Sequence, residues 1–147
     1  LDGILGYSGY DQNAPGTSYL LAFRTGVLEA VESDALSLQN DRKQFFRWQH
    51  KMIREGLDTC LAILKFLNIP SPAFGMVSAT NVRGYLVYVS PEFAPRNLAP
   101  FDRDMLILPE FLIENFQTPS FDLLKESFRL WWQACGLMWE PVAEHLR

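Results

Sequence analysis

Four acidic side chains lie on and beside a predicted strand near residue 105. They are Asp102, Asp104, Glu110 and Glu114. Acidic residues that flank a strand can bind a metal ion or act as general acid and base. A nuclease of the restriction type would add a lysine two residues from a strand carboxylate, and the sequence places none there. The pattern therefore favours strand-end capping and salt bridges over a catalytic or metal site.

A basic set occupies the first half of a predicted long helix. Its members are Lys43, Arg47, His50, Lys51 and Arg54, which share one helical face by spacing. Such a face can contact phosphates, so nucleic-acid binding through Lys43, Arg47, Lys51 and Arg54 is one interpretation. The chain as a whole carries a net charge of −4, and any soluble helix needs a charged outer face. The composition therefore favours a solvated face.

The third set is aromatic and lies near the C-terminal end. Trp131, Trp132 and Trp139, together with Phe128, could line a ligand pocket or form a partner surface. Adjacent Trp131 and Trp132 are separated by 100° around a helix, so we expect one of them at the margin of the core. Core packing is the favoured interpretation, and an interface or a small-molecule pocket is the alternative.

Other catalytic and metal-binding patterns are missing from the sequence. Cys60 and Cys135 each lie on the apolar face of a predicted helix, which indicates free, buried thiols. No CxxC occurs, the only histidines are His50 and His145, and no GxSxG marks a nucleophile. We therefore predict a protein that is not an enzyme, with no cofactor and no bound metal.

The element that organises the chain is predicted to be an amphipathic helix over residues 41–68. Asp41 is a suitable N-cap with Gln44 three residues later, Asn68 suits a left-handed C′ position, and Pro70 prevents continuation. Apolar residues between these ends recur at steps of three and four. A second helix is predicted over residues 119–135, with Pro119 in its first position and Gly136 at C′.

Strands are predicted on both sides of the long helix. Residues 19–24 and 27–32 form a hairpin around a two-residue connection, Thr25-Gly26, which places Tyr19 and Leu21 on one face beside Leu28 and Ala30. A short strand over residues 4–7 precedes it. The remaining strands are a second hairpin of residues 74–80 with 85–90, and a fifth strand over 105–108 that resumes at 111–113 beyond a bulge or at an edge.

These elements predict a single α+β domain over residues 1–147. We expect a mainly antiparallel sheet of about five strands, in the order ββαβββα, with both helices packed on one face. Nearly half of the residues are apolar (48%), which excludes a disordered chain. No apolar run approaches the ~20 residues that a membrane span needs, so we expect no membrane partner. The sequence starts without an initiator Met or a signal peptide, so we expect a fragment of a larger cytoplasmic protein.

Several short strings together resemble a known bacterial family. They are FRTGVLEAV (23–31), RGY (83–85), DRD (102–104) and LPEFLIE (108–114), followed by a helix with Trp131 or Trp132 and then Gly136. These strings are similar to the C-terminal regions of bacterial proteins whose N-terminal part is a Schlafen/AlbA-like DNA-binding or ATP-binding-like domain. The resemblance implies a regulatory, sensing or assembly domain whose partners are other domains of its parent protein or a second copy. It supplies no catalytic residue for this chain.

Overall fold

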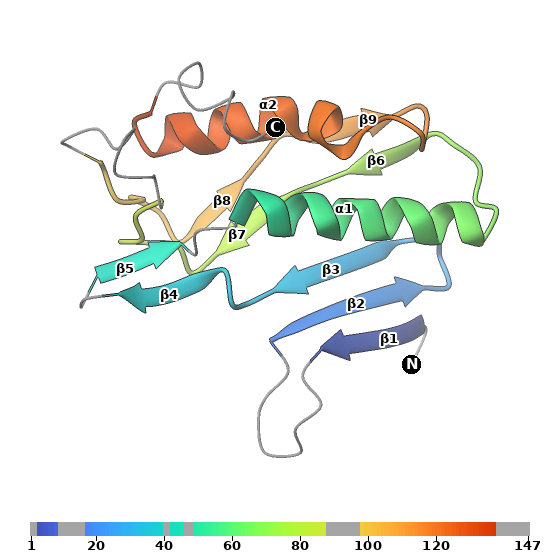
Figure 1. Ribbon diagram of the computed structural model, residues 1–147, viewed down its shortest axis with the longest axis horizontal. Coiled ribbons are helices and arrows are strands. Elements are labelled where there is room, and N and C mark those ends of the chain that lie inside the picture. The colour runs from blue at the N-terminus through green and yellow to red at the C-terminus, as the bar shows by residue number, and fades with distance from the viewer. Residues whose placement is uncertain (1–2, 9–16, 40–41, 46–48, 88–97, 138–147) are drawn as a thin grey trace.

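The computed structural model describes residues 3–8, 17–39, 42–45, 49–87 and 98–137. These residues form an α+β structure with two helices, as predicted, and their strands form small antiparallel sheets (Figure 1). In chain order the elements are β1 (Gly3–Ser8), β2 (Ser18–Phe23), β3 (Leu28–Glu32), β4 (Leu36–Gln39), β5 (Arg42–Phe45), α1 (Gln49–Phe66), β6 (Ala73–Gly75), β7 (Ser78–Thr80), β8 (Met105–Ile107), β9 (Phe111–Ile113) and α2 (Ser120–Ala134).

The strands are divided among several sheets, so the predicted single sheet of about five strands is not found among the described residues. β1, β2 and β3 form a three-stranded sheet, and the other strands pair as β4–β5, β6–β9 and β7–β8. The β6–β9 and β7–β8 pairs follow one another along the same two chain segments, residues 73–80 and residues 105–113. Two residues separate β6 from β7, but three separate β8 from β9, so the second segment carries one extra residue. Pro109 lies in this bulge, which is one of the two alternatives that the sequence left open, because proline cannot donate to a ladder.

The first hairpin has a different register from the predicted one. Phe23 pairs with Val27 through a hydrogen bond from the amide of Phe23 to the carbonyl of Val27 (2.8 Å). The connection is therefore three residues long, and Gly26 takes the left-handed conformation (φ 88°) that such a loop requires. Tyr19 consequently lies opposite Val31, and Leu28 lies opposite Ala22. The predicted placement of Leu28 beside Tyr19 and Leu21 was wrong, because a shift of one residue exchanges the two faces.

The predicted second hairpin is also wrong. Residues 73–80 pair with residues 105–113, whereas Val82 to Tyr85 form a turn that is closed by a hydrogen bond between these two residues (2.9 Å). The amide of Phe101 then donates to the carbonyl of Tyr85 (3.0 Å), and Val82 and Val87 are completely buried. The chain enters the core at this point instead of returning along the preceding strand. Residues 88–90 lie outside the described part.

The long helix begins later than predicted. Residues 42–45 form β5 and pair with β4, so the first turns of the predicted helix, and the segment expected to link to it, are a strand pair. The backbone groups of β5 form their hydrogen bonds with β4 instead of within a helix. The spacing of apolar residues cannot reveal a partner strand, so it indicated a helix here. Asp41, the predicted N-cap, lies outside the described residues.

Both helices end as the sequence predicted. At the end of α1, the amide of Ile69 donates to the carbonyl of Leu64 and the amide of Asn68 to that of Lys65, with Asn68 at a φ of 53°. At the end of α2, Leu137 and Gly136 make the corresponding bonds to Trp132 and Gln133. Gly136 has a φ of 75°. Each end is a Schellman motif, in which the residue at C′ must be left-handed.

Two clusters of buried side chains join the helices to the strands. One contains Leu106, Trp131 and Trp132, with Ile53 of α1 packed against it. The other contains Leu61 and Leu64 of α1 with Ile113 of β9. Since side chains alternate along a strand, Met105, Ile107 and Leu112 point to the opposite side, where they are exposed. Both helices therefore cover one face of the β6–β9 and β7–β8 pairs.

Candidate functional site

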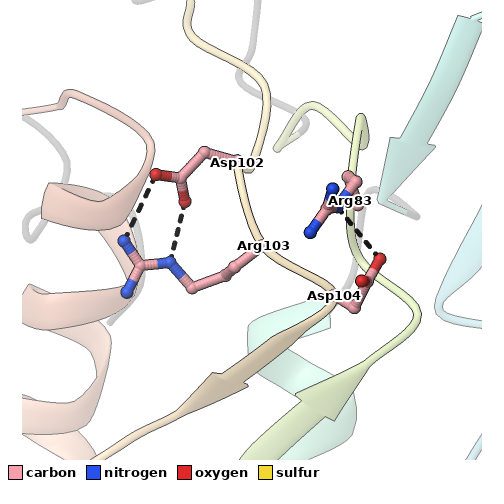
Figure 2. A network of polar contacts seen from close by, with 4 residues as sticks. All are labelled: Arg83, Asp102, Arg103 and Asp104. Atoms are coloured by element: carbon pink, nitrogen blue, oxygen red, sulfur yellow. Dashed lines mark hydrogen bonds and ion pairs between the residues drawn. The ribbon is translucent and has the colours of Figure 1, made fainter.

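Two members of the predicted acidic set, Asp102 and Asp104, are each paired with an arginine. The carboxylates of Asp102 and Asp104 are paired with neighbouring arginines (Figure 2): Arg103 Nε donates to Asp102 Oδ1 (2.8 Å), and Arg83 Nε lies 3.2 Å from Asp104 Oδ1. The hydrogen bond from Arg103 lowers the pKa of the Asp102 carboxyl. All four side chains are more than half exposed.

The other two predicted carboxylates, Glu110 and Glu114, are exposed. Within the described ranges, no group of three or more His, Cys, Asp or Glu side chains is arranged to hold a metal ion. The geometry is that of strand-end salt bridges, the interpretation that the sequence favoured.

The residues of the predicted basic helix face do not all belong to a helix. Lys43 belongs to β5 and not to a helix, and Arg47 lies outside the described residues. Lys51 is exposed and pairs with Glu55 one turn later (3.6 Å). The guanidinium carbon of Arg54 lies 5.8 Å from the centre of the Phe121 ring, and the Nε atom of Arg54 is buried. Arg54 therefore packs between α1 and α2 instead of projecting into solvent.

His50, which the spacing placed on the same basic face, is buried. It packs between aromatic residues of α2: its ring stacks on Trp132 at 4.9 Å and meets Phe128 edge-on at 4.6 Å. Burial lowers the pKa of His50 to about 3. Among the described residues, its Nε2 atom has no hydrogen-bond partner. The ring is therefore neutral near pH 7 and cannot attract a phosphate.

Trp131 and Trp132 are both core residues. Their exposed fractions are 3% and 2%, which agrees with core packing, the favoured interpretation. The expectation that one of them lies at the core margin was wrong. The reason is that α2 is covered on two sides: His50 of α1 lies on Trp132, and Phe101 meets Trp131 edge-on at 5.9 Å. Trp139, the third tryptophan of the predicted pocket or interface, lies outside the described residues.

Both cysteines are free thiols, as predicted. Cys135 is buried, and its thiol donates to the carbonyl of Trp131 (3.3 Å). Burial raises the pKa of Cys135 to about 12 and also raises that of the half-buried Cys60. Among the described residues, no basic side chain offsets this effect of burial, as the surroundings of a nucleophilic cysteine would.

The structure reveals a surface that the sequence analysis did not identify. On the face of the β6–β9 and β7–β8 pairs that the helices leave uncovered, five apolar side chains are exposed: Phe74, Met76, Met105, Ile107 and Leu112. We call them the outer apolar face. Phe74 and Leu112 are direct cross-strand partners. The signal in the sequence was that residues 105–107 and 111–113 are apolar at every position, whereas a strand with one wet face alternates.

The comparisons with known proteins add no relative. No family model, no curated protein and no solved structure matches this chain. Neither α1 nor α2, the helices in the described part, has the length and apolar character needed to cross a bilayer.

Proposed function

We propose that this chain is a non-catalytic protein-interaction domain of a larger regulatory protein of the bacterial cytoplasm. The outer apolar face is the observation that supports the proposal. Phe74 is 72% exposed, Met76 67% and Ile107 65%. Exposed apolar residues scattered singly are ordinary, but five on one face of two strand pairs, beside the exposed Ser78 and Thr80, are typical of a surface that another protein covers.

The composition of this face also supports a protein partner. Its five side chains are uncharged, and two of them are methionines, which adapt to different partner shapes. The centre of a protein interface is depleted in charge and enriched in aromatic residues and methionine. The partner in this proposal is a second copy of the chain, which would place the two outer apolar faces together around a twofold axis.

The proposal agrees with the resemblance to regions that follow a Schlafen/AlbA-like domain, where an assembly role is expected. The nucleic-acid alternative has less support, because Lys43 is on a strand, Lys51 is paired and Arg54 packs on Phe121. The small-molecule alternative also has less support, because Trp131 and Trp132 are buried in the core.

The test is the solution mass measured by light scattering over a range of protein concentrations. We expect the mass to approach twice that of the monomer as concentration rises. Phe74→Ser and Ile107→Ser should each keep the chain monomeric, because each puts a polar group at the centre of the face. Phe66→Ser is the matched control, since Phe66 is also an exposed apolar residue (84%) but lies at the end of α1. A monomer at every concentration, or equal association of all variants, would contradict the proposal.

A further inference from the structure

A large groove lies beside α1, between the three-stranded sheet and the strand pairs of the C-terminal half. In Figure 1, α1 runs across the view between β3 on one side and β6 and β7 on the other. Residues of all four elements line the groove, which has a volume of about 1610 Å³. Sites for small molecules occupy roughly 300–1,000 Å³, so this groove is large enough for a segment of polypeptide.

One side of the groove is the open edge of β3. Hydrogen bonds link Phe23 to Val27 and Thr17 to Ser33, and bonded pairs alternate along an antiparallel ladder. Leu28, Ala30 and Glu32 therefore direct their amide and carbonyl groups away from β2, toward the groove. Among the described residues, no strand pairs with β3 on that side.

The other side is the open edge of β7. The amide of Leu108 donates to the carbonyl of Val77 (3.0 Å), which fixes the alternation on the β7–β8 pair. Ser78 and Thr80 then direct their backbone groups away from β8. In the described part of the chain, β7 pairs with β8 alone. Two strand edges with unused ladder groups thus border one groove.

The floor and the charges of the groove specify a type of partner. α1 contributes apolar side chains such as Ile53 and Leu57, so a segment lying there would bury apolar residues against the helix. The charged residues among the described lining residues are Glu29, Glu32 and Glu55, and all three are acidic. Lys51, one turn from Glu55 on the rim, offsets part of that charge, whereas the two glutamates of β3 contact no basic side chain among the described residues.

We propose that this groove binds an extended, basic segment of a partner polypeptide, which adds as a strand between β3 and β7. Alternate residues of the segment would be apolar and pack on α1, on the side of β3 that carries Leu28. The lysine or arginine residues between them would lie on the other side, near Glu29, because side chains alternate along a strand. Strand addition to an open sheet edge is an established mode of peptide recognition, in which backbone hydrogen bonds give affinity and alternate side chains give specificity. Phe74 and Met76 of the outer apolar face also line the groove. The inference is carried by α1 and the edges of β3 and β7, so peptide binding and association of two copies can fail separately.

The probe is a fluorescently labelled peptide of about nine residues that alternates lysine with valine, roughly 30 Å long when extended. Fluorescence anisotropy with the full chain should give saturable binding that weakens as salt is added. Two control peptides have glutamate in place of lysine, or the same residues in two blocks without alternation. We expect both to bind at least tenfold more weakly.

Hydrogen exchange locates the binding site. The amides of Leu28, Ala30 and Glu32 on β3, and those of Ser78 and Thr80 on β7, should exchange more slowly when the lysine–valine peptide is bound. The amides of Leu21 and Phe23 serve as internal references, because they are already in the β2–β3 ladder.

Three substitutions test the geometry. Ala30→Pro removes an amide that points into the groove while leaving the bonds to β2, and it should weaken binding at least tenfold. Leu5→Pro is its matched control, because by the same alternation the amide of Leu5 points away from β2 at the far edge of the sheet. Gly56→Leu places a side chain from α1 in the groove, where a Cβ would meet no atom within 4 Å, and it should block binding without loss of the fold.

The proposal is overturned if the lysine–valine peptide does not bind, or if the glutamate peptide binds equally well. It is also overturned if binding leaves the exchange of the β3 and β7 amides unchanged, or if Gly56→Leu binds as tightly as the unaltered chain. Circular dichroism of each variant establishes that it is folded before binding is measured.

Discussion

The ring of His50 stacks on the ring of Trp132, with centroids 4.9 Å apart and planes inclined by 11°. This contact joins the first turn of α1 to the last turn of α2, and both residues are buried. A histidine in this position stays neutral, because its surroundings lower the pKa to about 3. The contact therefore makes the packing of the two helices sensitive to acid.

We predict that stability falls as the pH is lowered. The unfolded chain binds a proton on His50 near pH 6.5, whereas the folded chain does so only near pH 3. Between these values the unfolded state binds more protons, so the free energy of unfolding decreases by up to about 1.4 kcal/mol for each pH unit below 6.5. Urea denaturation across this range measures the decrease. His50→Phe should flatten the profile, and an unchanged profile in that variant would show that other groups cause the effect.

A second prediction compares the loss of stability when a core tryptophan is replaced with the loss when a residue of the outer apolar face is replaced. Trp132→Ala should lower the free energy of unfolding by about 3–5 kcal/mol, because it leaves a cavity beneath His50. Phe74→Ala removes an exposed ring, so its effect on monomer stability should stay within about 0.5 kcal/mol. Urea denaturation at low protein concentration gives both values. Similar losses for the two variants would mean that Phe74 packs against the same core.

The two thiols should differ in reactivity. Cys60 is half-buried with a raised pKa, whereas burial raises the pKa of Cys135 to about 12. With a disulfide reagent in native buffer, we expect Cys60 to react slowly and Cys135 to react only on unfolding. Cys60→Ser should abolish the native-state reaction, and Cys135→Ser should leave it. Native-state labelling of Cys135 would contradict the buried position of its Sγ atom.

The arginine–aspartate pairs of Figure 2 should contribute little to stability. Asp102→Asn and Asp104→Asn each remove one partner of an exposed pair, so we expect changes below about 1 kcal/mol. Thermal unfolding should also be unaffected by millimolar Mg²⁺ or Mn²⁺, since Arg83 and Arg103 occupy the space beside these carboxylates. If one of these metal ions raised the unfolding temperature, and if Asp104→Asn abolished that rise, Asp104 would belong to a metal site.

Local sequence signals predicted the helix ends well. The left-handed conformations of Asn68 and Gly136, and the interruption at Pro109, depend on one or two residues and their backbone chemistry. The predicted register at Gly26 failed because a two-residue and a three-residue connection both use a glycine there. The pairing of β4 with β5, which shortened α1, depends on a partner strand that residue spacing does not reveal.

The candidate sites were harder to predict than the elements. Spacing placed His50 among basic residues, but the aromatic residues of α2 that bury it and keep it neutral are about eighty positions away in the sequence. The adjacent tryptophans are both buried because separate elements cover each one. The groove beside α1 is bordered by the open edges of β3 and β7. Strand-pairing rules alone do not predict that these two edges lie along the same groove.

Gly56 lies in the middle of α1, where glycine costs a helix about 1 kcal/mol relative to alanine. A methyl group would meet nothing within 4 Å, so no packing constraint in the described structure excludes alanine at this position. The domain therefore forgoes a readily available gain in stability at a helical position that lines the groove. A lower stability than the fold allows is typical of positions where function and maximal stability conflict. A library selected only for thermal stability should accordingly replace Gly56 early, and its products should lose the space beside α1.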